Sequence, residues 1–545
     1  MWACCVMTAV TNINDVLDGH VGLHVECIDR LYLNAYVPNL QVGGQVVRFL
    51  GEHLGNPVPS PALFNKIGNR FRREVKAFAE ENGIPILALK KPDRSRWDDR
   101  KLDHVRPYLQ AAERDRRFGV VAIVYAHEFQ WVFGGRDRSN KPGVVNYAFD
   151  KSERRVGTYY FYLLDAHFGP GFIKICTYFP YPAKVWLNGH EWAKRQADQE
   201  GVAYQALANG FASCDDPVRL QAICDRLGPA DIQAFFDRWI THIPTPFTVA
   251  DRHAGYWWEL SMRQVEVSST FVFDDPRRAR GFFEALIADN IGIGRPAEVA
   301  AVFARRVQKN TPGMFRTRIF GPGTEVKLEF RYKHSRVKQY LKEGRALRIE
   351  TVINKPWDIG VRSRLFNLPE LVAKARAVNH RLLIIERAGQ DCAIGSALFE
   401  RTHQPYTNEG QRTGALRFGD PRVMALTGAL CVMIHAVTGF TNKSLRGLVA
   451  GLLGTDYTTN QMSYDLRRLR LHGLIERIPG TNTYTTTPDG IRVAAFYTKV
   501  HIRVLRPLIA GADHPPAPPE LRAALAAIDR QVATYVTAAR LGVAA

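Results

Sequence analysis

The chain has 545 residues, of which 73 are lysine or arginine and 53 are aspartate or glutamate, so its formal net charge is +20. Hydrophobic residues make up 46% of the chain, which excludes a largely disordered protein and predicts several buried cores. Because the positive charge is not concentrated in long runs, it predicts basic faces on folded domains with nucleic acid as the partner. No apolar run of about 18 residues occurs, which argues against a membrane span.

The eight cysteines include no Cys-x-x-Cys pair, so neither a zinc ribbon nor a redox motif is expected. They are typical of reduced thiols, and we expect a cytoplasmic protein associated with the bacterial nucleoid. The first residues have no basic segment and too short an apolar run for a signal peptide. We expect translation to start at Met7, which makes residues 1–6 an upstream extension.

The first predicted domain, residues 1–115, is mainly helical and basic. Ser60 and Pro61 predict the N-cap and first-turn proline of a helix that runs to Ala79. Two interpretations of its basic side remain open, a track for a phosphate backbone and an ordinary solvated helix face. The basic residues concerned are Lys66, Arg70, Arg72, Arg73 and Lys76.

The second predicted domain, residues 116–310, combines strands with helices. Its apolar and aromatic runs predict four strands, and Asn188 opens a helix after the last of them. A later aromatic segment, 255–266, is interpreted as a helix with Glu259 and Glu266 on one face. The four predicted strands are residues 119–125, 158–165, 172–178 and 183–187.

Asp165 ends the second of these strands, an arrangement that nucleases with a ribonuclease-H-like core use to present a metal-binding carboxylate. We therefore consider Asp165 and Glu191 as ligands of a divalent metal, with turn capping as the alternative for Asp165. His167 and His190 lie at the same hairpin ends, but no spacing typical of a metal site links them, so structural roles are favoured for both.

The third predicted domain, residues 311–410, contains a β-meander over 327–353 followed by a helix. Between Arg331 and Arg348 there are seven lysines or arginines against one acid, with tyrosines among them, a mixture that suits phosphates and stacked bases. Glu350 interrupts this basic region and predicts either a metal ligand or an ion pair with Arg348 or Arg345. The residues expected to contact nucleic acid are Arg331, Lys333, Arg336 and Lys338.

The segment 340–342, Tyr-Leu-Lys, followed by 347–350, Leu-Arg-Ile-Glu, resembles a pair of strands in replication initiators of rolling-circle plasmids and filamentous phages. The resemblance covers about 25 residues. It implies that Tyr340 is a covalent nucleophile near Lys342. The chain departs from those initiators because it has no His-hydrophobic-His metal motif, so this route ranks below a metal-dependent one.

A broader resemblance is to a family of long bacterial proteins that occur dispersed and in many copies, as mobile-element proteins do. It spans most of the chain and is carried by three landmarks. It implies nucleic-acid processing without specifying the reaction. The landmarks are residues 165–169, 188–192 and 347–351.

The fourth predicted domain, residues 420–510, resembles the winged helix-turn-helix of bacterial regulators. Helices are predicted over 421–437, 442–453 and from Thr458 onward, followed by a hairpin within 478–490. The resemblance implies that polar residues of the third helix face the DNA groove, while its arginines Arg467 and Arg468 reach phosphate, with Arg470 on the same helix. The groove-facing residues are Thr459, Asn460, Gln461, Ser463 and Tyr464.

Together these patterns predict an α+β, multi-domain protein with a mixed sheet, a C-terminal winged helix and a Pro-rich turn and helix over 511–545. The predicted function is a mobile-element nuclease, nickase or strand-transfer enzyme, of the transposase or replication-initiator class, with magnesium or manganese bound by Asp165 and Glu350. The alternative is a non-catalytic DNA- or RNA-binding regulator. The expected partner is duplex DNA, with structured RNA and a homo-oligomer as further possibilities. A short distance between Asp165 and Glu350 favours the enzyme, and a wide one the binding protein.

Overall fold

The computed structural model of the chain describes residues 19–88, 99–139, 146–290, 292–320, 326–390, 396–408, 410–433, 439–501 and 527. The chain divides into two compact units, Met1–Glu386 and Arg387–Ala545. This division lies 24 residues before the predicted boundary at residue 410, and the predicted boundaries at residues 115 and 310 fall inside the first unit. The predicted segments 1–6 and 511–545 lie outside the described residues, apart from residue 527.

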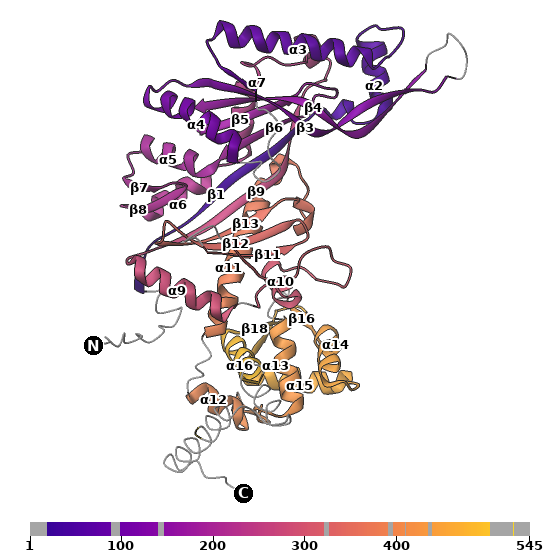
Figure 1. Ribbon diagram of the computed structural model, residues 1–545. Coiled ribbons are helices and arrows are strands. Elements are labelled where there is room, and N and C mark those ends of the chain that lie inside the picture. Colours follow the sequence, from indigo (N-terminus) through magenta and orange to yellow (C-terminus); the bar gives the residue numbers. More distant parts are fainter. Residues whose placement is uncertain are drawn as a thin grey trace. The chain divides into compact units, whose positions relative to one another are not determined.

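The first unit is built on one 11-stranded mixed sheet with the order β10-β11-β12-β13-β9-β1-β6-β5-β4-β3-β2 (Figure 1). All neighbours are antiparallel except the pair β2 and β3. The strands are β1 (Val21–Tyr36), β2 (Ile86–Ala88), β3 (Gly119–Asp137), β4 (Tyr147–Asp165), β5 (Gly169–Cys176), β6 (Ala183–Asn188), β9 (Glu259–Phe273), β10 (Arg318–Phe320), β11 (Lys327–Tyr332), β12 (Ser335–Lys342) and β13 (Ala346–Ile353).

The strand order shows a repeated topology within this sheet. In one half β1 lies beside β6, and β5, β4 and β3 follow outward; in the other half β9 lies beside β13, and β12, β11 and β10 follow outward. Each half therefore begins with a long strand that pairs with the last strand of its own meander. The two halves join through the antiparallel pair of β1 and β9, in the middle of the sheet.

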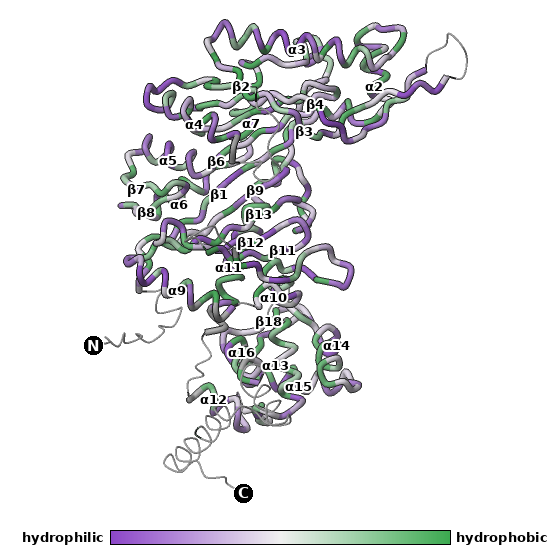
Figure 2. The backbone as a smooth tube through the Cα atoms, in the orientation of Figure 1, coloured by the Kyte–Doolittle hydropathy of each residue, from purple (hydrophilic) through white to green (hydrophobic). Residues whose placement is uncertain are grey.

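The helices of the first unit occur between these strands and after the last one. Asn188 caps α5, and Asp216 caps α6, as the short polar side chains at these positions favour. Helix α3 is amphipathic, because its buried residues, among them Phe64, Phe71 and Val75, are spaced along one side. Figure 2 shows hydrophilic and hydrophobic residues alternating along this helix. The helices are α2 (Gly43–Arg48), α3 (Ala62–Glu81), α4 (Asp99–Arg114), α5 (Gly189–Gln199), α6 (Pro217–Arg226), α7 (Pro229–Ile240), α8 (Val249–His253), α9 (Pro276–Asp289), α10 (Pro296–Phe303) and α11 (Leu368–Gln390).

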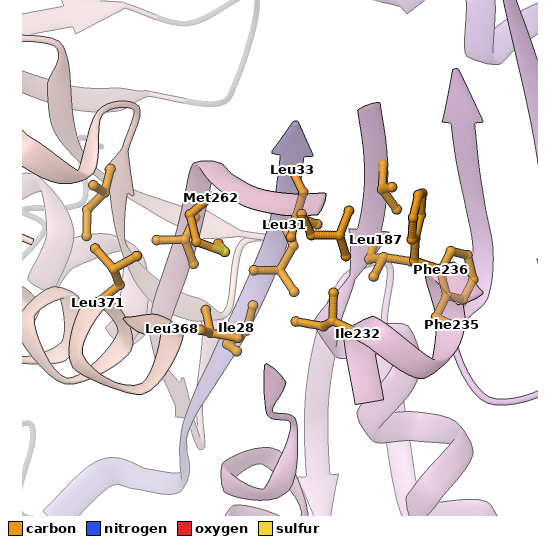
Figure 3. Packing of buried hydrophobic residues seen from close by; sticks show 14 of the residues in the cluster. Ile28, Leu31, Leu33, Leu187, Ile232, Phe235, Phe236, Met262, Leu368 and Leu371 are labelled. Atoms are coloured by element: carbon orange, nitrogen blue, oxygen red, sulfur yellow. The ribbon is translucent and has the colours of Figure 1, made fainter. Parts of the chain in front are cut away.

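One face of the sheet is covered by the main hydrophobic core. Alternate residues of β1, such as Leu31 and Leu33, are fully buried there. Figure 3 shows them beside Leu187 of β6 and Met262 of β9, with side chains of α7 and α11 packed nearby. Helices α3 and α10 contribute to the same core. Because hydrophobic side chains cover this face, we expect clusters of polar and charged side chains on the opposite face.

The opposite face carries a smaller apolar cluster where α4 lies on β3 and β4. Toward β13, the short hairpin of β7 (Tyr204–Leu207) and β8 (Gly210–Cys214) reaches the sheet through Asn209. Between these two regions, side chains of β1, β6 and β9 remain solvent-accessible. We call this side of the sheet the polar face.

The second unit is a helical domain with a small three-stranded sheet in the order β16-β18-β17. Thr441 and Thr458 cap α14 and α15, each through a hydrogen bond from the backbone of the first turn. Its elements are α12 (Ser396–His403), β14 (Tyr406–Asn408), β15 (Gln411–Thr413), α13 (Pro421–Met433), β16 (Phe440–Thr441), α14 (Asn442–Leu453), α15 (Thr459–Leu471), β17 (Ile475–Arg477), β18 (Thr483–Thr486) and α16 (Pro488–Val500).

One predicted element is wrong in type. The segment 255–266 is interpreted as a helix, but residues 259–266 are the beginning of β9, a strand that continues to Phe273. Its β-branched run after Met262 suits a buried central strand, which pairs with β1 on one side and β13 on the other. Among the described residues, no helix combines the length and apolarity that a membrane crossing needs.

Candidate functional site

Three buried carboxylates meet on the polar face around Glu350. Within the described part of the chain, Asp29, Glu266 and Glu350 are the only group of at least three acidic, histidine or cysteine residues whose ligand atoms all lie within 4.8 Å of one another. Glu350 comes from β13 and Glu266 from β9. Asp29 comes from β1 at a register shift between Ile28 and Arg30, where the strand has one residue more than its partner.

Arg348 lies at the centre of this group and is completely buried. Its Nη2 is 3.0 Å from Oδ2 of Asp29, and its Nε is 2.9 Å from Oε1 of Glu350. The guanidinium also donates to the backbone carbonyl of Asn209 and approaches Nε2 of His190 at 2.8 Å. Five donor positions on one planar group make arginine suited to such a site.

Two further cations complete what we call the Glu350 network. Lys338 Nζ is 3.4 Å from Oε2 of Glu350 and 4.0 Å from Oε1 of Glu266. Arg30 Nε is 3.9 Å from Oε2 of Glu266. The network therefore has three carboxylates and three cations, a formal balance of zero. An ion that binds here competes with side chains that already neutralise the acids.

The pKa values follow from this arrangement. Burial raises the pKa of Asp29, but Arg348 and hydrogen bonding outweigh it and leave the pKa below its ordinary value. For Glu266 burial dominates, so its pKa is raised although Lys338 lowers it in part. Asp29 is thus firmly ionised, whereas Glu266 holds its proton more tightly than an exposed glutamate.

The predicted nucleophile Tyr340 contacts this network through Glu350. Its hydroxyl donates to Oε1 of Glu350 at 2.6 Å. Burial, followed by the charge of Glu350, raises its pKa well above the ordinary value. Lys342 is also affected, because burial and Arg348 lower its pKa. A tyrosinate is therefore disfavoured, and the predicted activation of Tyr340 near Lys342 is not what the structure presents.

Asp165 and Glu350 do not meet, which corrects the predicted metal pair. Their strands β4 and β13 are separated by β5, β6, β1 and β9, so five strand spacings of about 4.8 Å put the two strands roughly 24 Å apart. Asp165 is fully buried and accepts hydrogen bonds from the backbone amides of His167 and Phe168. Its other oxygen accepts from Arg238 and Trp239. The turn-capping alternative describes these contacts.

The other residues expected near Asp165 have separate partners. Glu191 lies in the first turn of α5 and pairs with Lys194 at 2.8 Å. His190 is buried against Ser268 and Arg348, where burial lowers its pKa, and His167 is exposed. Within the described residues these side chains form no metal-binding group with Asp165.

The basic meander is largely neutralised by a buried acid. Glu329, only 2% exposed, lies 2.7 Å from Arg331 and 3.6 Å from Arg336, and Arg318 approaches it as well. Lys338 belongs to the Glu350 network. Lys333, in the turn after β11, has its ammonium 5.3 Å from the ring centroid of Tyr332. Most of the cations expected to bind phosphate here already have carboxylate partners.

Helix α15 has the two-sided pattern that its sequence predicts. Met462, Asp465, Leu466 and Leu469 are buried in the second unit. The residues that the resemblance assigned to the groove or to phosphate are exposed, except Arg468. These exposed residues are Thr459, Asn460, Gln461, Ser463, Tyr464, Arg467 and Arg470.

Arg468 corrects one of these predictions. Its side chain is only 12% exposed, with Nη1 3.5 Å from Asp465, and its Nε donates to the carbonyl of Gly414 at 3.1 Å. It is therefore occupied within the unit. Arg467 reaches Gln411 of β15 at 3.3 Å, so the β14–β15 hairpin lies against the second half of α15.

Comparisons of the chain with protein-family models, with curated proteins and with solved structures found no match.

Proposed function

We propose that the protein binds duplex DNA through its second unit and reads the sequence with the first two turns of α15. The observation that carries this proposal is the row of exposed polar residues from Thr459 to Tyr464 on a helix whose other side is buried. Polar side chains near the N-terminus of a helix are the groups that contact base edges in the major groove.

The order of elements supports a winged helix. A helix, a short strand, two helices and a hairpin follow one another as α13, β16, α14, α15 and β17–β18, and β18 lies between β16 and β17. In that architecture the second of the paired helices enters the groove and the hairpin contacts the flanking backbone. Arg477 lies at the end of β17, close to the hairpin tip.

The contacts of α15 divide its exposed residues by role. Arg446 of α14 donates to Thr459, and Asn442 donates to Ser463 at 3.0 Å, so these two hydroxyls are oriented by the preceding helix. Gln461 accepts from the backbone of Thr458 and completes the helix cap. Asn460 is exposed with no hydrogen bond among the described residues. We therefore expect Asn460 to make the strongest base contact.

Selection from a random duplex library by the full-length protein tests the proposal. Wild type should enrich a defined site, and Asn460→Ala should weaken binding to that site by about tenfold, since one bidentate base contact is worth roughly 1–3 kcal/mol. Gln404→Ala, at an exposed position outside α15, is the matched control and should bind as wild type does. The proposal fails if no sequence is enriched, or if Asn460→Ala selects the same site with equal affinity.

A second candidate function is metal-dependent cleavage or transfer of a phosphodiester at the Glu350 network. The convergence of three carboxylates favours it, because such oxygens bind magnesium or manganese. The donor set fits a hard cation, but the three neighbouring cations would have to move or be compensated. The residues that would hold the ion are Asp29, Glu266 and Glu350, and the ion would polarise a phosphate oxygen.

Titration with manganese separates this candidate from a purely structural network. Paramagnetic resonance of the full-length protein should detect bound manganese, and Glu350→Gln should abolish that signal while thermal unfolding reports the fold. If wild type binds no manganese up to millimolar concentration and cuts no DNA, the second candidate is lost. DNA binding by the second unit is measured independently and does not depend on this result.

A further inference from the structure

The centre of the polar face carries a group of aromatic and basic side chains that have no role in the proposed functions. We call it the central strip and define it as Tyr32 of β1, Lys184 and Trp186 of β6, and Arg263 of β9. Tyr32, Lys184 and Trp186 are half-buried, and Arg263 is exposed. The strip lies where the two halves of the sheet join.

The strand register places these residues on one side of the sheet. Tyr32 pairs directly with Trp186, and Lys184 pairs with Lys174 of β5, so these side chains share a face. Arg263 falls at the register shift of β9 opposite Tyr32, and its guanidinium carbon is 5.8 Å from the centroid of the Tyr32 ring. Lys184 Nζ approaches the same ring at 5.8 Å.

The positive charge of the strip has no local carboxylate partner. Within the described residues, neither Lys184 nor Arg263 has a hydrogen bond or an ion pair. The acid that interacts electrostatically with Lys184, Glu128 of β3, is itself paired with Lys174 at 2.7 Å and Lys101 at 2.5 Å. Burial lowers the pKa of Lys184 to about 7, with Lys174 and Arg263 adding to the effect and Glu128 opposing it. An anion placed here would relieve this repulsion.

The aromatic rings of the strip extend across the strands. Trp186 stacks on Phe172 of β5, with ring centroids 5.9 Å apart and planes at 7°. Tyr32 meets Phe172 edge-on at 6.2 Å. An open antiparallel sheet that presents half-buried rings beside unpaired cations has both features that bind single strands, because bases stack on rings while phosphates meet the cations.

We propose that the central strip binds single-stranded DNA, with phosphates at Lys184 and Arg263 and bases against Tyr32 and Trp186. A single strand is the fitting occupant because duplex DNA keeps its base faces stacked within the helix and offers none to a ring. An acidic peptide would use the cations but leave the rings without a function. The proposal concerns the first unit and stands independently of duplex recognition by α15.

Binding should be linked to proton uptake. The charged or titratable groups that act on Lys184 are Lys174 and Cys176 of β5, Arg263 of β9 and Glu128 of β3. A phosphate beside Lys184 stabilises its protonated form and raises its pKa. Affinity for single-stranded DNA should therefore fall as the pH rises from 7 to 9, and Lys184→Met should remove much of that dependence.

Fluorescence anisotropy of the full-length protein with labelled oligo(dT) of about 20 nucleotides tests the proposal. Arg263→Glu should reduce affinity about tenfold at low salt, and Lys184→Met and Trp186→Leu by a few-fold each. Two matched controls lie outside the strip, Arg362→Glu at an exposed position after β13 and Trp131→Leu on β3, whose side chain is 63% exposed. Both controls should bind as wild type does.

The proposal is overturned if Arg263→Glu, at an exposed site where folding is not at risk, binds oligo(dT) as tightly as wild type. It is also overturned if the controls lose as much affinity as the strip variants, or if the protein binds oligo(U) but not oligo(dT). A selected duplex measured in parallel separates the two functions, since strip variants should retain duplex affinity and Asn460→Ala should retain oligo(dT) affinity.

Discussion

The Glu350 network and the central strip lie on the same face of one sheet, but the cations of the network are paired with carboxylates and those of the strip are not. In the network, Arg30, Lys338 and Arg348 are matched by three buried carboxylates. In the strip, Lys184 and Arg263 have no carboxylate partner within the described residues. In the basic meander, four of the seven lysines and arginines between Arg331 and Arg348 are therefore paired with carboxylates, while the strip has fewer cations but no carboxylate partner for them.

The difference shows that local counts of charged residues do not locate an anion-binding surface. Only one acid lies among the seven basic residues between Arg331 and Arg348. Two of the acids that neutralise them, Glu329 and Glu350, lie just outside this range in the sequence. The others come from distant strands, with Asp29 supplied by β1 and Glu266 by β9. Charge that is free to bind a phosphate is what remains after all strands of the sheet have been assembled.

Replacing the central cation of the network should have the largest effect on stability. Arg348→Met leaves Asp29 and Glu350 buried without their main partner, so the free energy of unfolding should fall by about 3–5 kcal/mol. Urea unfolding followed by tryptophan fluorescence measures it. Arg263→Met in the strip is the matched control and should change stability by no more than about 0.5 kcal/mol.

Equal losses in these two variants would contradict the distinction between network and strip. A second check is the double variant Asp29→Asn/Arg348→Met. It should be more stable than Arg348→Met alone, because the asparagine leaves no uncompensated charge at that position.

Removing the acid at the border of the strip should have an intermediate effect. Glu128→Gln removes the carboxylate that pairs with both Lys174 and Lys101, and we expect the free energy of unfolding to fall by about 3 kcal/mol at pH 7. Burial opposes ionisation of Glu128, but Lys174 and Lys101 lower its pKa to about 2. The stabilisation is therefore complete above about pH 4.5 and is lost as the pH falls toward 2.

Chemical unfolding at pH 7 and pH 3 checks this expectation. The difference between wild type and Glu128→Gln should be smaller at pH 3. A difference that stays constant between the two pH values would indicate that the glutamine disturbs packing and not charge.

The smallest effect concerns Lys184 itself. Its pKa of about 7 lies below the usual 10.5, so the unfolded chain binds more protons than the folded one between these values, and stability should rise with pH in that window. Because the side chain is partly solvated, we expect a gain of only about 1 kcal/mol from pH 7 to 9. Lys174 contributes with the same sign, so Lys184→Met should flatten the profile in part. If Lys184→Met leaves the dependence of stability on pH unchanged, the pKa of Lys184 is not lowered in the folded protein.

Much of the fold was accessible from local sequence patterns. The alternation over 327–353 predicts the meander that forms β11, β12 and β13, and the caps at Thr441 and Thr458 predict the starts of α14 and α15. The aromatic cluster in 255–266 predicts a helix, but residues 259–266 belong to strand β9. The β-branched run that follows, through Val272, is the signal that favours a strand.

Much less of the candidate site could be predicted from the sequence. Glu350 stands out as an acid within a basic strand, but its partner Asp29 lies 321 positions earlier, in a segment where no acid pattern draws attention. The two meet only because β1, β9 and β13 are neighbours in the sheet. For Asp165 the local sequence is ambiguous, because an aspartate before a glycine turn is as typical of a turn cap as of a metal ligand.

The join between the halves of the sheet has a consequence for synthesis of the chain. Strand β1 ends at Tyr36, whereas its neighbours β6 and β9 begin only at Ala183 and Glu259. At roughly 5–20 residues per second, the ribosome needs about 7–30 s to reach the first of these partners. For that time a 16-residue strand has neither of its native neighbours. Nascent β1 is therefore a strong candidate for binding by chaperones that recognise extended apolar segments.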